Sequence, residues 1–310
     1  SDKFKFRFSG STFSQEDVWR QLDPENPSGY KRYNFGANTT AELYDGLVAN
    51  FIISGMVDKR YQPYISTNGK AFRQNYMEPS YSPIYANNNP DYYYDGLADF
   101  NPLAIIDSKL TGYYDDRNVN YETTFTLTYD LPWVKGLQLK GLFAYDSKQR
   151  TTKVMQRYYN EYKYINEEYK PTGVNQPSRL QYDTNQGYFR QTQLSVSYSN
   201  TFGDNHNVTG LLVGEHRIST GTQFRAQKNF ELDVLDQLDA GVTDNAVATG
   251  SDFVPSINLG LVGRVNYDYR TKYLAEFSFR YDGSSLFPRE SRWGFFPGFS
   301  LAWRLSEEPF

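Results

Sequence analysis

The sequence predicts an all-β fold, an antiparallel up-and-down transmembrane β-barrel segment of about ten strands. Three observations predict it. Apolar and polar residues alternate over long stretches, aromatic residues gather near the ends of these stretches, and short and long connections follow one another in turn. Alternation with a period of two is typical of strands that have one apolar and one polar face.

The candidate strands are long. They lie near residues 3–12, 30–38, 47–58, 119–129, 137–145, 188–198, 206–216 and 257–269, with one ending at Asp282-Gly283 and one starting at Trp293. Most have roughly 9–13 residues, more than the ~5–6 that are usual in soluble proteins. A tilted strand needs ~9–11 residues to cross a bilayer, so these lengths favour a membrane barrel.

The connections between the strands separate into two kinds. Residues 39–46, 130–136, 199–205 and 270–272 form short links, and longer ones cover residues 14–29, 59–117, 148–187, 217–256 and 282–292. Outer-membrane barrels have short periplasmic turns and long extracellular loops. Because every short link has the size of a hairpin, we expect the strands to neighbour each other in sequence order, without a buried helix.

Each strand has two chemically different faces. In a membrane barrel the apolar face is the outer one and the polar face lines the lumen. We therefore expect lipid-facing positions at Phe125, Leu127, Leu194, Val196, Leu259 and Leu261. The expected lumen-facing positions are Thr124, Thr126, Gln193, Ser195, Asn258 and Arg264. Aromatic residues make up 17% of the chain, and those near the strand ends are typical of the girdles at membrane interfaces.

Composition excludes several classes of function. The chain has 310 residues and no cysteine, which rules out disulfides and thiolate chemistry. A net charge of −4 gives no basic field for nucleic acid. No apolar run approaches the ~18 residues of a membrane helix. The start at Ser1 and the end at Phe310 suggest a piece of a longer protein, so we expect residues 1–310 to be part of a single barrel domain.

The C-terminal part of the chain carries specific motifs. They are Arg280 to Ser285 (RYDGSS), Arg292 to Pro297 (RWGFFP), Trp303-Arg304 and Ser306 to Glu308 (SEE). Together they resemble the SusC/RagA family of TonB-dependent outer-membrane transporters. Further similar stretches are Asn101 to Ile105, Asp130 to Asp146, His206 to Arg217 and Gly263 to Leu274, so the resemblance covers about two thirds of the chain.

This resemblance implies a larger protein than the present chain. The family's barrel has 22 strands and is filled by an N-terminal plug domain, so the ten strands would be its central part, with the plug and the other strands outside these residues. The implied partners are a SusD-like surface lipoprotein that covers the barrel, TonB, which would act through an N-terminal region, the outer-membrane lipid, and an oligosaccharide or peptide ligand.

Candidate contact residues lie in the loops and at the barrel rim. Tyr92, Tyr93 and Tyr94 precede Asp95 in the longest loop, and aromatic faces and carboxylates bind sugars. Tyrosine-rich surfaces serve protein contacts and loop packing equally well. Arg280, Arg292 and Trp293 belong to the most specific motif, where we expect the arginines to face the lumen or rim and to pair with carboxylates.

No catalytic or cofactor site is expected. His206 and His216, placed in a turn and at a strand end, have no marked partners for a metal or a catalytic triad. Asp233, Asp236 and Asp239 form a weak candidate for a loop calcium site, although their spacing differs from that of an EF-hand. A solvated acidic loop is the simpler interpretation.

Substrate import by an energy-coupled outer-membrane transporter is the leading functional hypothesis, with oligosaccharides before peptides as the cargo. A passive porin or structural barrel is the first alternative, and a secreted β-rich adhesin or soluble β-sandwich is the second. An outer-membrane hydrolase is a more remote alternative. We expect recognition to reside in the long loops and the lumen mouth, because the turns are too short to form a site.

Overall fold

A computed structural model describes residues 3–65, 70–96, 99–232 and 234–308. The strands of the main sheet are β1 (Phe4–Glu16), β2 (Gly29–Tyr44), β3 (Leu47–Pro63), β4 (Gly112–Asp130), β5 (Leu137–Gln156), β8 (Ser178–Phe202), β9 (His206–Phe230), β10 (Val247–Asp252), β11 (Ser256–Tyr269), β12 (Tyr273–Ser284) and β13 (Trp293–Trp303). A separate hairpin consists of β6 (Tyr159–Ile165) and β7 (Glu168–Val174). The helices are α1 (Lys70–Met77) and α2 (Ser108–Thr111), with short 3₁₀ turns at Ala86–Asn88, Ala104–Ile106, Leu238–Ala240, Arg289–Ser291 and Leu305–Glu307.

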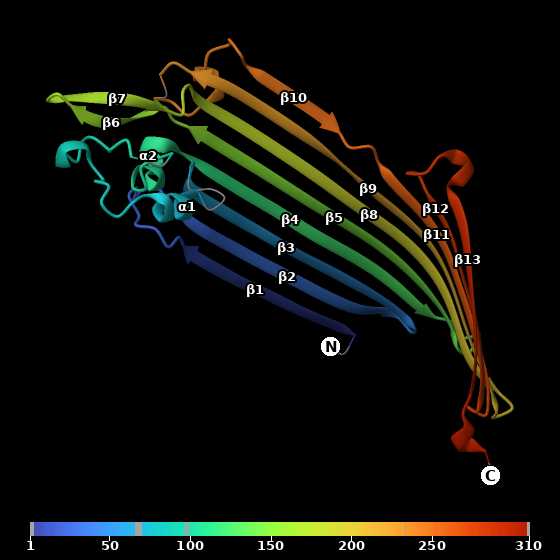
Figure 1. The fold of residues 1–310 in the computed structure, drawn as a ribbon. Helices are drawn as coiled ribbons and strands as arrows, with labels where there is room; N and C mark the ends of the chain where they lie inside the picture. Colours follow the sequence, from blue (N-terminus) through green and yellow to red (C-terminus); the bar gives the residue numbers. More distant parts are fainter. Residues whose placement is uncertain (1–2, 66–69, 97–98, 233, 309–310) are drawn as a thin grey trace.

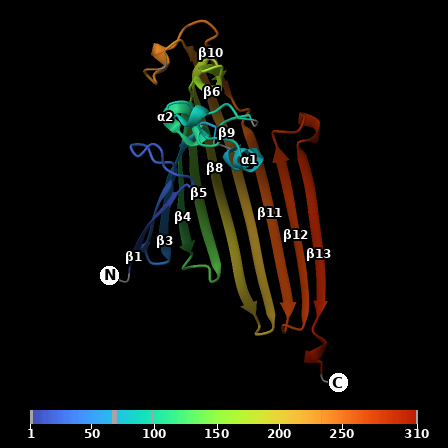
Figure 2. The ribbon, with the colours of Figure 1, turned by 60° about the vertical axis from the view of Figure 1, so that its left-hand side comes forward.

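The strands form one curved antiparallel sheet in the order β1-β2-β3-β4-β5-β8-β9-β11-β12-β13. The short strand β10 pairs with residues 222–227 of β9, toward the C-terminal end of that strand. Ten strands therefore follow one another in sequence order, as predicted. Figure 1 shows the helices, the β6–β7 hairpin and β10 at one end of the sheet, with the tight turns at the other. Figure 2 shows the same separation from a second direction. The sheet is a segment of a barrel wall whose long loops lie at one rim.

The register confirms the two predicted faces. Phe125 pairs with Phe143, which pairs with Thr192, and that row continues through His216 to Leu259. The neighbouring row runs from Thr124 through Ala144, Gln191 and Arg217 to Asn258. Because side chains in one row share a face and alternate along each strand, all six predicted apolar positions lie on one face and all six polar positions on the other.

The strands are longer than predicted at the loop end. β8 and β9 each have 25 residues, far more than the ~9–11 that cross a bilayer. The predicted loop 148–187 consists largely of strand and of the β6–β7 hairpin, and His216 lies inside β9 rather than at its end. The strands therefore continue beyond the membrane and support the loops.

A small apolar core holds the loops together. Ile65, Ala71, Ala104, Ile105 and Tyr159 are all buried, each with at most 4% of its surface exposed. Ala71 belongs to α1, but apart from Ala71 and Gln74 the residues of this helix are exposed, so α1 lies on the surface of the loops, in line with the expectation of no buried helix. The long β3–β4 connection buries a few apolar side chains against its neighbours, and a helical turn satisfies its backbone there.

Helices do not contribute a membrane crossing in the part of the chain that the structure describes, since none is both long and apolar enough.

Candidate functional site

The polar face of the sheet carries paired charges at the loop end. Arg150 on β5 forms two hydrogen bonds to Asp116 on β4, from Nε to Oδ1 at 2.8 Å and from its terminal nitrogen to Oδ2 at 3.0 Å. The Thr152 hydroxyl donates to the same carboxylate at 2.9 Å. Further along the face, Nε of Arg225 contacts Oδ1 of Asp183 at 2.5 Å. Such charge-assisted pairs fix the side chains that line the lumen mouth.

Arg280 lies on this polar face, as expected from the sequence. Its Nε donates to Asp282 at 2.6 Å, and its terminal nitrogen donates to Oε1 of Glu215 at 2.5 Å. Arg217 reaches the same Glu215 oxygen at 2.6 Å. The RYDGSS motif thus joins β12 to β9 through a four-residue charge cluster, so its arginine and aspartate have a clear structural role.

The other two residues of this candidate group lie elsewhere. Nε of Arg292 donates to the main-chain carbonyl of Phe287 at 3.0 Å and so closes the loop before β13. Trp293 lies on the apolar face, where its ring stacks on Tyr281 with the ring centroids 4.9 Å apart and the planes 15° apart. The structure therefore separates Trp293 from Arg280 and assigns it to the aromatic girdle of the outer face.

The Tyr92–Tyr94 run docks onto the β6–β7 hairpin. The Tyr92 ring stacks on Tyr169 with 3.9 Å between centroids and meets Tyr162 edge-on at 4.8 Å. The main-chain N–H of Tyr162 donates to the carbonyl of Tyr93 at 2.7 Å. Tyr93 packs against the loop core, and all three rings are half-buried. These contacts favour the loop-packing interpretation of the run.

Asp95 continues this attachment. Its Oδ2 accepts a hydrogen bond from the Thr172 hydroxyl on β7 at 2.8 Å and lies 3.4 Å from Nζ of Lys163 on β6. The main-chain N–H of Asp95 donates to the carbonyl of Tyr162 at 2.9 Å. All four predicted loop residues, Tyr92 to Asp95, thus come together at one hairpin.

Asn101 and Glu161 are the buried polar centre of the loops, and the sequence interpretation did not single them out. Asn101 uses its side chain fully, because Nδ2 donates to the carbonyls of Ile84 and Tyr94 while Oδ1 accepts from the N–H groups of Leu103 and Ala104. The only sequence signal at this position is the stretch Asn101 to Ile105, which resembles the SusC/RagA family.

Glu161 is almost fully buried and accepts two hydrogen bonds. The main-chain N–H of Asn101 donates to Oε1 at 2.8 Å, and the Tyr159 hydroxyl donates to the same oxygen at 3.0 Å. Burial raises the pKa of the Glu161 carboxyl to about 7, because the two hydrogen bonds only partly offset the loss of solvation. Asp95 and Glu78 nearby raise it further.

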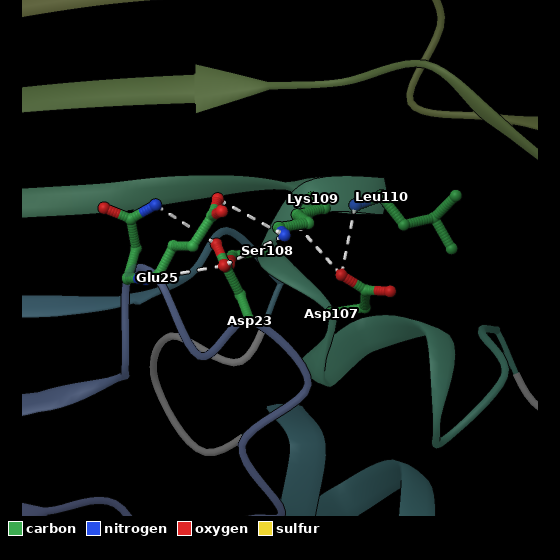
Figure 3. Close-up of polar contacts among 7 residues, drawn as sticks. Asp23, Glu25, Asp107, Ser108, Lys109 and Leu110 are labelled. Atoms are coloured by element: carbon green, nitrogen blue, oxygen red, sulfur yellow. Dashed lines mark hydrogen bonds and ion pairs between the residues drawn. The ribbon is translucent and has the colours of Figure 1, made fainter.

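A second polar cluster ties the β1–β2 loop to α2 (Figure 3). The carboxylate of Asp23 accepts a hydrogen bond from the Ser108 hydroxyl at 3.1 Å and lies 3.5 Å from Nζ of Lys109. Lys109 also lies 3.5 Å from Glu25, and the Asp107 carboxylate accepts from the N–H groups of Lys109 and Leu110. Although burial opposes ionisation, hydrogen bonds from Asn26 and Ser108 lower the pKa of Asp23. The first two long loops are therefore joined into one assembly.

The acidic loop does not form a metal centre in the described residues. Asp233 lies outside them, and Asp239 sits in an exposed 3₁₀ turn. Asp236 instead accepts hydrogen bonds from the Tyr113 hydroxyl and, at 3.0 Å, from Nζ of Lys153. Across the described ranges no group of three or more His, Cys, Asp or Glu side chains is placed to hold a metal.

A polar hollow opens on the lumen side of the long strands, also missed by the sequence interpretation. It encloses about 560 Å³. Its lining is rich in amides and comprises Gln156, Gln176, Pro177, Arg179, Gln227, Asn229, Asn245, Ala246 and Val247. The register places Gln156, Arg179 and Asn229 in one row on the polar face. Amide and guanidinium groups donate and accept hydrogen bonds, so this hollow can hold a polar ligand.

The curved meander, its opposite faces and its one-sided loops define an outer-membrane β-barrel protein. Comparisons with known proteins narrow the class. TonB-dependent receptor P39 of Formosa agariphila is 35% identical over 126 residues, which are 40% of this chain and 12% of that protein. TonB-dependent receptor SusC of Bacteroides thetaiotaomicron is 48% identical over 48 residues, 16% of this chain and 5% of that protein. No protein-family model matches the chain.

Solved structures agree with this fold. The RagAB peptide importer in its closed-closed state matches 96% of this chain and 32% of its own, with a TM-score of 0.74 and 19% sequence identity. The open-open state of the same importer gives a TM-score of 0.74 with 20% identity. In sequence and fold the chain thus resembles part of the barrel of outer-membrane TonB-dependent receptors of the SusC/RagA type. It spans about a third or less of the length of the proteins that it matches.

Proposed function

We propose that this chain is part of the wall of an energy-coupled outer-membrane importer for oligosaccharides or, as the second substrate class, peptides. The observation that carries the proposal is the polar face, which continues from the membrane-spanning rows to the amide-lined hollow at the loop end. A ligand can exchange hydrogen bonds along that path. The plug domain and the region that contacts TonB belong, in this proposal, to parts of the protein outside residues 1–310.

The hollow is the proposed site where the ligand is first held by this part of the wall. Gln227 and Asn229 lie on β9 with Arg179 opposite Asn229 on β8. Amide side chains hydrogen-bond sugar hydroxyls and peptide groups equally well, which supports a polar ligand without choosing between the two classes. The name of RagAB refers to peptides, whereas the relatives of Formosa agariphila are named only as receptors.

The experiment uses the full-length transporter in its native host. Gln227→Leu combined with Asn229→Leu should lower uptake and growth on the cognate oligosaccharide or peptide at least tenfold. Gln149→Leu, on the opposite face of β5, is the matched control and should leave growth unchanged. Equal growth of the double variant and the control would contradict the proposed site.

The energy requirement tests the importer against the alternatives. Growth that depends on the transporter should be lost when TonB is removed. Uptake that persists without TonB would favour the passive porin, and a chain that never fractionates with the outer membrane would favour the secreted adhesin.

The partner in this proposal is a SusD-like lipoprotein that rests on the loop assembly. Tyr76 on α1 is 92% exposed and Tyr81 is 80% exposed. Because tyrosine side chains contribute most to binding energy when an interface buries them, these two are the proposed contacts with the lipoprotein. Tyr76→Ser combined with Tyr81→Ser should reduce co-purification of the lipoprotein with the full-length transporter. Tyr158→Ser, a partly exposed tyrosine near the hairpin, is the control. Unchanged co-purification of the double variant would place the contact elsewhere.

A further inference from the structure

The outer apolar face has a hollow at Gly214. This glycine lies in β9, with Leu194 of β8 in register on one side and Leu261 of β11 on the other. A Cβ atom at Gly214 would meet no other atom within 4 Å. The missing side chain leaves a gap between two leucine walls on the face that contacts lipid.

The gap is part of a larger notch of about 470 Å³. Its lining comprises Thr192, Leu194, Gly214, Glu215, His216, Leu259, Gly260, Leu261, Tyr281 and Trp293. The stacked rings of Tyr281 and Trp293 form its wall toward β13, and Leu194 is 68% exposed at its edge. Most of these groups are apolar, so the notch favours a hydrocarbon occupant.

Two basic or hydrogen-bonding side chains lie at the loop end of this notch. His216 follows Gly214 by two positions on the same face of β9. Arg190 is exposed on β8, opposite Ile218, which is the next outward position beyond His216. Tyr281 and Trp293 lie close to the loop end of β12 and β13, where an aromatic girdle marks the extracellular interface. Arg190 and His216 are therefore at headgroup level and the notch is at the level of the outer acyl chains.

We propose that this notch binds one acyl chain of lipid A, the phosphorylated glycolipid of the outer leaflet, while Arg190 and His216 hold a lipid A phosphate. The notch is continuous with the surface that already faces lipid, which selects a membrane lipid as the occupant. The guanidinium complements a phosphate and binds it through two parallel hydrogen bonds, and the imidazole can donate a further one. This inference does not depend on the identity of the imported substrate.

The glycine in the notch has a matched control on the same strand. Gly210 lies on the same outward face of β9, and a Cβ there would also meet nothing within 4 Å. It is outside the set of residues that line the notch. Gly214→Leu fills the notch, whereas Gly210→Leu adds the same side chain elsewhere on the lipid-facing surface.

The test is native mass spectrometry of the full-length transporter in detergent, with added bisphosphorylated lipid A or its dephosphorylated form. The wild type should retain one bisphosphorylated lipid A, Gly214→Leu should lower its occupancy at least tenfold, and Gly210→Leu should leave it unchanged. Arg190→Gln should weaken binding of the phosphorylated form and leave the dephosphorylated form unaffected. If Gly214→Leu assembles poorly, Arg190→Gln still tests the proposal.

Three outcomes would overturn the proposal. They are equal retention by the two leucine variants, equal loss of both lipid forms in Arg190→Gln, and retention of glycerophospholipid in place of lipid A by the wild type.

Discussion

The main-chain N–H of Asn101 donates a hydrogen bond to Oε1 of Glu161 over 2.8 Å, and this bond joins the β3–β4 connection to the β6–β7 hairpin. The two residues are nearly inaccessible to solvent. Each of the two segments therefore supplies the hydrogen-bond partner of a buried polar group in the other. Without that partner, burying the N–H of Asn101 or the carboxyl of Glu161 would cost free energy. The loops that carry the proposed contact surface for the SusD-like lipoprotein therefore form one folded unit.

The stability of this unit should depend on pH through Glu161. Burial raises the pKa of its carboxyl from 4.5 to about 7, so the folded loops bind a proton more tightly than the unfolded loops. The stability that protonated Glu161 gives to the folded loops is fully present below pH 4.5 and is lost as the pH rises toward 7. A pKa shift of this size corresponds to roughly 3 kcal/mol. Protection factors of residues 159–165 in the full-length transporter, which correct hydrogen exchange for its base-catalysed intrinsic rate, should be higher at pH 5 than at pH 8. In Glu161→Gln, which mimics the neutral carboxyl, the protection factors should be the same at the two pH values. Higher protection of the wild type at pH 8 than at pH 5 would contradict the assignment.

The membrane-spanning part of the fold could be predicted because one physical rule acts on every strand there. Lipid on one side and water on the other force the alternation of Phe125 with Thr124 and Thr126, and the register confirms it. Beyond the headgroups both faces meet water or loops. Apolar and polar residues such as Tyr182 and Asp183 can then occupy either face, so the alternation fades. For this reason the 25-residue lengths of β8 and β9 could not be predicted.

The loop assembly could be predicted only in part, because its contacts join distant segments. The aromatic ring of Tyr92 marks it as a candidate contact residue, but its stacking on Tyr169 depends on a hairpin whose sequence does not alternate strongly. Ile65 and Tyr159 share a core although the chain between them crosses the sheet twice. No local pattern indicates such a pairing. Arg280 was placed correctly because it lies within the alternating region.

Asn101 should be the most sensitive position of the loops. Asn101→Ala removes four hydrogen bonds and leaves the carbonyl of Tyr94 without the amide donor, whereas the carbonyl of Ile84 keeps the main-chain N–H of Tyr94. Each buried group that loses its partner costs about 1–3 kcal/mol, so residues 84–107 should become accessible to limited proteolysis. Asp91→Ala, at an exposed loop position, is the control and should keep the wild-type pattern. Resistance of both variants to the protease would show that the Asn101 network is dispensable.

The orientation of the faces can be tested at the middle of a spanning segment. Phe125 lies between Tyr121 and Tyr129 on the apolar face of β4 and so near the centre of the hydrocarbon layer. Phe125→Arg should destabilise the barrel by about 2–4 kcal/mol, because the charge must enter lipid. Thr126→Arg on the adjacent polar face should cost far less. Urea titration of both full-length variants in lipid vesicles measures the difference, and equal costs would invert or abolish the assignment.

Glu308 of the SEE motif should hold together the turn end of the last two strands. Its carboxylate accepts hydrogen bonds from Nζ of Lys272 at 2.5 Å, from the Tyr273 hydroxyl at 2.8 Å and from Nε1 of Trp303 at 3.0 Å. Glu308→Ala leaves all three donors without this acceptor, so hydrogen exchange near residues 270–273 and 303 should accelerate in the full-length transporter. Glu290→Ala, in the loop at the opposite end of the same hairpin, is the control and should leave that exchange unchanged. If the two variants exchange alike at the turn end, the motif serves a contact outside residues 1–310 and does not clasp β12 to β13.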